Sequence, residues 1–108
     1  MVAKNDLVVE VTEQEFSEFI KNKLVVVDFF AELCMPCVML APVLEDIAGK
    51  VKEVKFAKIN VDGSQELASK YDVSSIPCLI IFKDGEEIDR IIGGQPSEAI
   101  EEKIKSFL

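Results

Sequence analysis

The chain has 108 residues with a formal net charge of −8, and 49% of them are hydrophobic, which suits one globular domain over residues 1–108. Its apolar runs are too short to span a bilayer and its lysines and arginines form no cluster, so we expect neither membrane insertion nor nucleic-acid binding. The absence of histidine excludes Cys/His zinc sites and histidine acid–base catalysis, and the lack of an apolar leader in residues 1–20 predicts a cytoplasmic protein.

Hydrophobic periodicity and turn residues predict nine elements after a frayed start at residues 1–6. In chain order they are a strand over 7–11, a helix over 13–22, a strand over 24–30, a helix from 34 to about 49, a strand over 54–61, a helix over 65–71, a strand over 79–82, its antiparallel partner over 87–92 and a helix over 97–107. This alternation indicates an α/β fold with a central mixed β-sheet and helices on both faces. The unit from 24 to 61 would be a right-handed parallel crossover.

Several polar residues mark the ends of these elements. Thr12 and Glu15 match a capping box at the start of the first helix. Ser64 could cap the helix that follows it. Asp84 and Gly85 are the residues of a tight hairpin turn between the last two strands.

Two cysteines three residues apart lie where the apolar strand over 24–30 leads into a helix. Cys34 and Cys37 would share one face of the first helical turn, close enough to form a disulfide. Unpaired N–H groups and the helix dipole stabilise a thiolate there, so we expect the outer Cys34 to attack, with a lowered pKa, and the more buried Cys37 to resolve a mixed disulfide. The alternatives are cysteines that only fill core space, or a zinc or iron–sulfur site, which needs about four ligands where the chain has three cysteines.

Two charged residues interrupt apolar strands near these cysteines. Asp28 falls within the strand over 24–30, where burial would raise the pKa of its carboxyl group. Such a group could accept a proton from Cys37 as that thiol attacks, although a surface-facing carboxylate near the strand end is the alternative. Lys58 interrupts the neighbouring strand, and it could either pair with Asp28 or face solvent.

Taken together, the motifs resemble the thioredoxin family over nearly the whole chain. They are Val27-Asp28-Phe29-Phe30-Ala31-Glu32, Cys34-Met35-Pro36-Cys37, Ala41-Pro42, Lys58-Ile59-Asn60-Val61-Asp62, Ser75-Ile76-Pro77 and Gly93-Gly94. The resemblance implies a thioredoxin fold and reversible reduction of protein disulfides, with no cofactor beyond the redox-active Cys34–Cys37 disulfide. It also implies disulfide-containing protein substrates and an electron donor of the thioredoxin-reductase type, and we expect a monomer.

The resemblance further implies a substrate-docking surface around the dithiol. Pro77 would be a cis-proline that faces the cysteines, and Ile76 would present its backbone to an extended substrate. The remaining members of this surface would be Leu33, Met35, Pro36 and Gly93.

Three residues depart from the usual pattern of the family. Leu33 stands where tryptophan is usual, Met35 where glycine is usual, and Cys78 where threonine usually follows the cis-proline. Cys78 would bring a third thiol near the site, and we predict that it is buried and inert. Because the residues between the two cysteines influence the redox potential, Met35 leaves a disulfide oxidase or isomerase as an alternative. The third thiol and the missing tryptophan leave a non-catalytic or metal-binding module.

Overall fold

The structure, a computed structural model, describes residues 7–108, so the start at residues 1–6 lies outside it. Its elements are β1 (Val8–Glu10), α1 (Glu13–Phe19), β2 (Leu24–Phe30), α2 (Met35–Lys50), β3 (Lys55–Asn60), a 3-10 turn (Val61–Gly63), α3 (Gln65–Lys70), β4 (Cys78–Lys83), β5 (Glu86–Ile92) and α4 (Ser97–Lys105). All nine predicted elements are therefore confirmed, and the 3-10 turn is added to them. No helix in the described range is long and apolar enough to cross a membrane.

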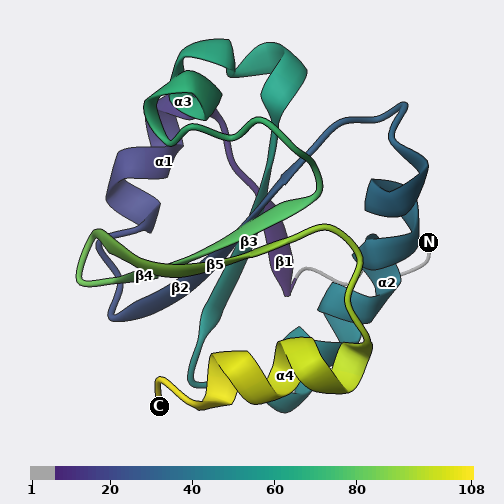
Figure 1. Cartoon of the computed structure of the whole chain (residues 1–108). Helices are drawn as coiled ribbons and strands as arrows, with labels where there is room; N and C mark the ends of the chain where they lie inside the picture. The colour runs from purple at the N-terminus through teal and green to yellow at the C-terminus, as the bar shows by residue number, and fades with distance from the viewer. Residues whose placement is uncertain (1–6) are drawn as a thin grey trace, which may run out of the picture.

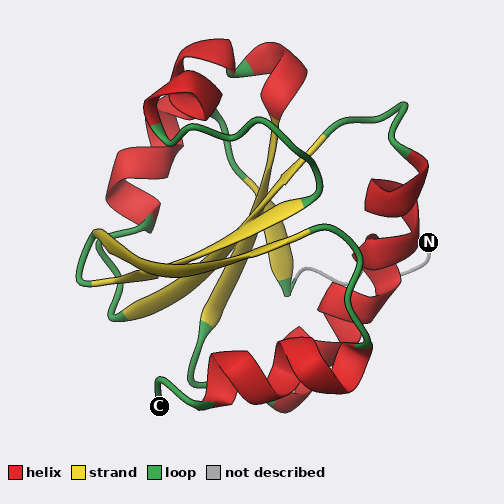
Figure 2. Ribbon diagram, viewed as in Figure 1, coloured by secondary structure: helices red, strands yellow, loops and turns green. Residues whose placement is uncertain are grey.

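The five strands form one mixed sheet in the order β1-β3-β2-β4-β5. β2 and β1 each run parallel to β3, whereas β4 runs antiparallel to both β2 and β5. Helices α1 and α3 cover one face of the sheet, and α2 and α4 cover the other (Figures 1 and 2). The predicted mixed sheet, with its terminal hairpin and helices on both faces, is confirmed.

β2 lies at the centre of the sheet and between two apolar cores. Its side chains alternate between them: Val26 packs with residues of α2 and α4, while Val25 and Val27 pack with residues of α1. The three valines are fully buried. Because both faces are covered, β2 needs the nearly continuous apolar sequence that predicted it, and Asp28 is the exception within it.

The hairpin between β4 and β5 turns through Asp84 and Gly85, as predicted. Their φ angles are 53° and 90°, and Lys83 pairs with Glu86 across the ladder. Two successive positive φ angles are typical of a type I′ turn, which glycine and aspartate tolerate better than branched residues.

The predicted capping box begins α1. Glu15 N–H donates to the Thr12 hydroxyl at 3.2 Å, and Thr12 N–H donates to the Glu15 carboxylate at 2.9 Å. The helix ends at Phe19 rather than at the predicted residue 22, because Asn22 turns back and its side-chain amide donates to the Phe19 carbonyl at 2.7 Å. This bond satisfies a carbonyl that another helical turn would have used.

Ser64 lies at the predicted N-cap position of α3, but its side chain does not cap the helix. Ser64 occupies the N-cap position, but its backbone (φ −143°, ψ 52°) departs from the usual extended cap and its hydroxyl makes no capping bond. The Leu67 N–H donates instead to the carboxylate of Glu13, on α1, at 3.1 Å. An acceptor 54 residues away in the chain therefore satisfies the first turn of α3.

Candidate active site

The two cysteines meet at the start of α2, directly after the connection from β2. Cys34 is the N-cap residue and is partly exposed, whereas Cys37 is 3% exposed. They form a disulfide with their Cα atoms 5.2 Å apart. The Cys37 N–H points at the Cys34 sulfur over 3.2 Å. The predicted pair, with an outer and an inner sulfur, is confirmed.

Asp28 is buried in β2, as predicted. The residue is 3% exposed, and its Oδ1 has no hydrogen-bond partner among residues 7–108. Burial raises the pKa of this carboxyl from 3.8 to about 7, against a smaller lowering by the positive charge of Lys58. The surface-facing alternative for Asp28 is wrong, because α2 covers this face of the sheet.

Lys58 is the direct neighbour of Asp28 across the parallel β2–β3 ladder. Both side chains therefore emerge on the α2 face of the sheet. Lys58 is half-buried, and its ammonium lies 5.6 Å from the centre of the Phe30 ring. It forms no direct ion pair with Asp28, but its charge acts on the carboxyl. The structure therefore lies between the two alternatives, a pair with Asp28 and a solvent-facing lysine. Lys58 is on the same face as Asp28 and acts on it through its charge, but makes no ion pair with it.

A pocket of about 260 Å³ opens beside Asp28 and the inner cysteine. Its lining residues come from the end of β2, from β3 and from the first turns of α2: Asp28, Phe30, Ala31, Glu32, Cys37, Val38, Ala41 and Lys58. Of these eight residues, only Asp28, Cys37 and Lys58 were predicted as site residues. Strand alternation could have identified Phe30, because it lies two residues after Asp28 on the same face.

The start of β4 lies at the same edge of the sheet as the end of β2, because Phe29 pairs with Cys78. The Ile76–Pro77 peptide that precedes β4 is cis, as the family resemblance implied. Gly93 follows β5 with a φ of 82°, and its N–H donates to the Pro77 carbonyl at 2.9 Å. The fold thus brings the predicted Ile76, Pro77 and Gly93 to the edge of the sheet where α2 begins.

Exposed apolar side chains surround the disulfide. Leu33 is 101% exposed and Met35 is 67% exposed, and Pro36 between the cysteines is also exposed. Met39, one helical turn after Met35, is 67% exposed as well. Met39 was not predicted, although its spacing of four residues from Met35 places the two on one face of α2.

Cys78 is buried, as predicted, but it does not join the dithiol. It is 1% exposed and packs in the core on the α1 side of the sheet, whereas Asp28 emerges on the α2 side. Burial raises the pKa of the Cys78 thiol, against a lowering by the charge of Arg90. Alternation along β4 turns the Cys78 side chain to the face of the sheet opposite Asp28, so this third thiol follows Pro77 directly but does not line the pocket beside Cys37. Within residues 7–108, no three His, Cys, Asp or Glu side chains are arranged to hold a metal ion.

Comparisons with known proteins agree with this geometry. The family model described as Thioredoxin matches residues 7–106. A thioredoxin of Chlamydia caviae is 47% identical over 83% of this chain and 88% of its own, and one of Staphylococcus saprophyticus is 43% identical over 94% and 98%. Among solved structures, a mutant thioredoxin from Halobacterium salinarum has a TM-score of 0.88 at 36% identity, covering 99% of this chain and 96% of its own. The oxidised mitochondrial thioredoxin 3 of Saccharomyces cerevisiae has a TM-score of 0.86 at 33% identity, covering 96% and 99%. The chain therefore belongs to the thioredoxin family and is a thiol–disulfide oxidoreductase that reduces protein disulfides.

Proposed function

We propose that the protein reduces its substrates through a mixed disulfide on Cys34, and that Asp28 takes the proton of Cys37 when this intermediate is resolved. One observation carries the proposal: Cys37 and the buried Asp28 carboxyl line the same pocket, behind a cysteine pair of which the outer member is the more exposed. This arrangement separates an attacking sulfur from a resolving sulfur and gives the resolving one a nearby base.

In the first step the Cys34 thiolate attacks a substrate disulfide. A new S–S bond forms between Cys34 and one substrate sulfur, the substrate S–S bond breaks, and the other substrate sulfur leaves as a thiolate that takes a proton from solvent. The Cys37 N–H already points at the Cys34 sulfur over 3.2 Å, and it stabilises the thiolate form together with the start of α2.

In the second step the Cys37 thiol gives its proton to Asp28 and attacks Cys34. The mixed disulfide breaks, the second substrate thiolate is released, and the Cys34–Cys37 disulfide forms, so two electrons pass from the protein to the substrate. With its pKa raised to about 7, Asp28 is partly ionised near neutral pH and is a stronger base than an ordinary carboxylate. Lys58 supports this role because its charge opposes the effect of burial.

The substrate docks across the exposed edge around the disulfide. Ile76 and Pro77 offer backbone to an extended segment that carries the substrate cysteine, and apolar side chains on the α2 side contact its flanks. The residues assigned to this surface are Leu33, Met35, Pro36, Ile76, Pro77 and Gly93. The exposed apolar side chains of Leu33, Met35 and Pro36 suit protein substrates better than small charged disulfides.

The oxidised protein is returned to the dithiol by an electron donor of the thioredoxin-reductase type, because the exchange consumes one dithiol per substrate. We place this cycle in the cytoplasm, where a reducing environment supplies the electrons and keeps the buried Cys78 as a thiol. We also propose that the protein acts as a monomer, since one chain holds both cysteines and the base. Sedimentation in the oxidised and reduced states tests the monomer: a dimer in the active state would contradict it.

The mechanism is tested with insulin reduction driven by dithiothreitol and followed by turbidity. We expect the wild-type protein and a Cys78→Ser control to accelerate the reaction, and Cys34→Ser to abolish the acceleration. Cys37→Ser should accumulate a mixed disulfide with its substrate on Cys34, and Asp28→Asn should slow the release of that substrate. A wild-type rate no faster than that of Cys34→Ser would refute the proposal.

The direction of the exchange is tested by redox titration against glutathione. A potential near −270 mV, roughly that of reducing members of the fold, is expected for a reductase. The exposed Met35 between the cysteines is the feature that would shift it. A much less negative potential would favour the alternative, a disulfide oxidase or isomerase.

A further inference from the structure

We propose that Arg90 is a positioning residue, whose guanidinium fixes the segment 72–77 and so sets the position of Ile76 and Pro77 at the docking edge. The inference rests on the docking role of these two residues in the proposed function, and it adds a residue that neither the motifs nor the pocket beside Asp28 include. Arg90 lies in β5, one of the two edge strands of the described sheet, and its side chain reaches the end of α3.

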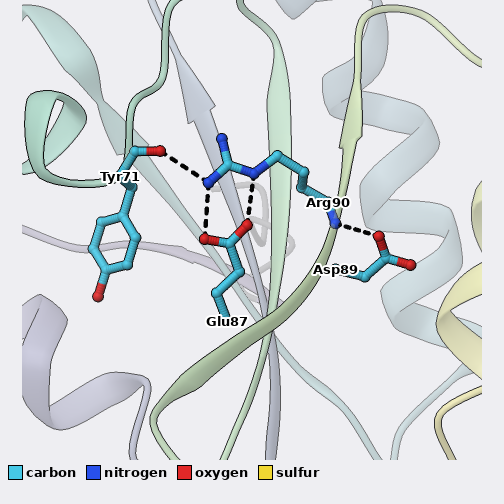
Figure 3. Close-up of polar contacts among 4 residues, drawn as sticks. All are labelled: Tyr71, Glu87, Asp89 and Arg90. Carbon is cyan, nitrogen blue, oxygen red and sulfur yellow. Dashed lines mark hydrogen bonds and ion pairs between the residues drawn. The ribbon is translucent and has the colours of Figure 1, made fainter.

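Arg90 makes a forked contact with Glu87 of its own strand and one further bond to Tyr71, at the end of α3 (Figure 3). Its Nε and Nη2 donate to the two carboxylate oxygens of Glu87, at 2.6 and 2.8 Å, and Nη2 also donates to the Tyr71 carbonyl at 2.8 Å. The side chains of Arg90 and Glu87 are 25% and 29% exposed. A planar guanidinium held by a bidentate carboxylate has little freedom, so its third bond fixes the Tyr71 carbonyl in one direction.

Tyr71 is a firm anchor for this bond. It is the C-cap residue of α3, and its ring packs 5.6 Å from the ring of Phe16 and 5.5 Å from that of Phe82. The next residue, Asp72, has a left-handed backbone with a φ of 55°. The chain therefore leaves α3 through a sharp turn whose first carbonyl Arg90 holds, and this turn begins the segment that ends at Pro77.

The far end of the same segment is also tied to β5, because Gly93 N–H donates to the Pro77 carbonyl at 2.9 Å. β5 in turn is held to α4, since Asp89 accepts the Arg90 backbone N–H at 2.8 Å and pairs with Lys103 at 3.0 Å. Both ends of segment 72–77 are thus tied to β5, and its start is also held to α3, where the Val73 N–H donates to the Ala68 carbonyl at 2.8 Å. Loss of the Arg90 contact removes the tie between the start of the segment and β5 and leaves the dithiol, Asp28 and their pocket unchanged.

Cys78 provides an independent report on this segment. It follows Pro77 directly, is 1% exposed and lies near enough to Arg90 for the guanidinium charge to lower the pKa of its thiol. In the oxidised protein Cys78 is the one free thiol, because the other two cysteines form the disulfide. Its rate of alkylation therefore reports how often the structure around the start of β4 opens.

The test compares Arg90→Leu, Arg90→Lys and the control Lys103→Leu, which removes a different ion pair of β5 away from segment 72–77. For each variant, kcat and KM are measured for insulin and for the small disulfide dithiobis(nitrobenzoate). We expect Arg90→Leu to raise the KM for insulin about tenfold with little change in kcat, and to leave the small disulfide unaffected. Arg90→Lys keeps the charge but not the fork, so it should fall between Arg90→Leu and wild type. Iodoacetamide should label Cys78 of the oxidised Arg90→Leu protein faster than that of the control.

If the wild-type protein reduces insulin and Arg90→Leu has the same KM for insulin, the positioning role alone would be overturned. If Arg90→Leu lost the same fraction of activity on insulin and on dithiobis(nitrobenzoate), and its unfolding midpoint fell below that of wild type, the positioning role would also be overturned. These results would show that the Arg90 contact serves stability alone. A wild-type protein no more active than Cys34→Ser would instead overturn the proposed function on which the role rests.

Discussion

Replacement of Asp28 by asparagine should make the oxidised protein more stable at neutral and alkaline pH. Asp28 is 3% exposed, its Oδ1 lacks a hydrogen-bond partner within the described part of the chain, and burial raises the pKa of its carboxyl to about 7. Ionisation of a buried group without a direct partner costs free energy in the folded state alone. Asparagine has nearly the same shape and cannot ionise, so the variant avoids this cost.

The sign of the pH dependence follows from where the protons bind. Between pH 3.8 and about 7 the folded state holds a proton on Asp28 that the unfolded state has lost, so the free energy of unfolding falls as pH rises, by about 1.4 kcal/mol per pH unit. A difference of about 3 units in pKa gives about 4 kcal/mol in total. Relative to wild type, Asp28→Asn should therefore gain about 4 kcal/mol between pH 4 and pH 8, added to a constant offset from its buried amide.

The assay is denaturation by guanidinium chloride at intervals between pH 4 and pH 8, on the oxidised proteins. The chain has no tryptophan, so far-ultraviolet circular dichroism follows unfolding. Asp89→Asn is the control, because its hydrogen bond with Lys103 lowers the pKa of Asp89 below 3.8. The contribution of Asp89 to stability is therefore lost only below the range of this assay, so the curve of Asp89→Asn should stay parallel to that of wild type between pH 4 and pH 8. Parallel curves for wild type and Asp28→Asn across this range would refute the reasoning about Asp28.

Three further predictions use the same denaturation and insulin assays. Lys58→Met removes a charge that lowers the pKa of Asp28, so the fall in stability should continue to higher pH than in wild type; an unchanged curve would contradict this. Thr12→Ala removes one bond of the capping box and should cost about 1 kcal/mol with no change in insulin reduction; a loss of activity at equal folded fraction would count against it. Cys78→Ala leaves a small cavity on the face of the sheet away from the dithiol, so it should cost about 1 kcal/mol while the rate of insulin reduction stays the same; a slower reaction would indicate that Cys78 takes part in it.

Local patterns predicted the features that depend on local physics. The apolar sequence of β2 requires cover on both faces, the hairpin turn requires two positive φ angles at Asp84 and Gly85, and the dithiol requires a helix start. The burial of Asp28 followed in the same way, because its position within a covered strand leaves it little access to water.

Features that depend on distant pairing could not be predicted in this way. Ser64 is a residue type that often caps helices, yet the carboxylate of Glu13, on another helix, accepts the hydrogen bond from the first turn of α3. Arg90 resembles any charge on an edge strand until the fold brings Tyr71 beside it. The position of Lys58 likewise depends on the register of β2 and β3, which no local pattern encodes.

The two properties of Asp28 are linked through one pKa. The carboxyl can accept the proton of Cys37 in its ionised form, and this is also the form that weakens the fold, so the pH at which stability stops falling marks the pH at which the base becomes available. The rate at which the mixed disulfide is resolved should rise with pH around 7, with a midpoint within about one pH unit of the pH at which stability stops falling. Asp28→Asn should remove both pH dependences together and leave a protein that is more stable but slower. If the resolution rate kept its midpoint in this variant, a group other than Asp28 would be the base.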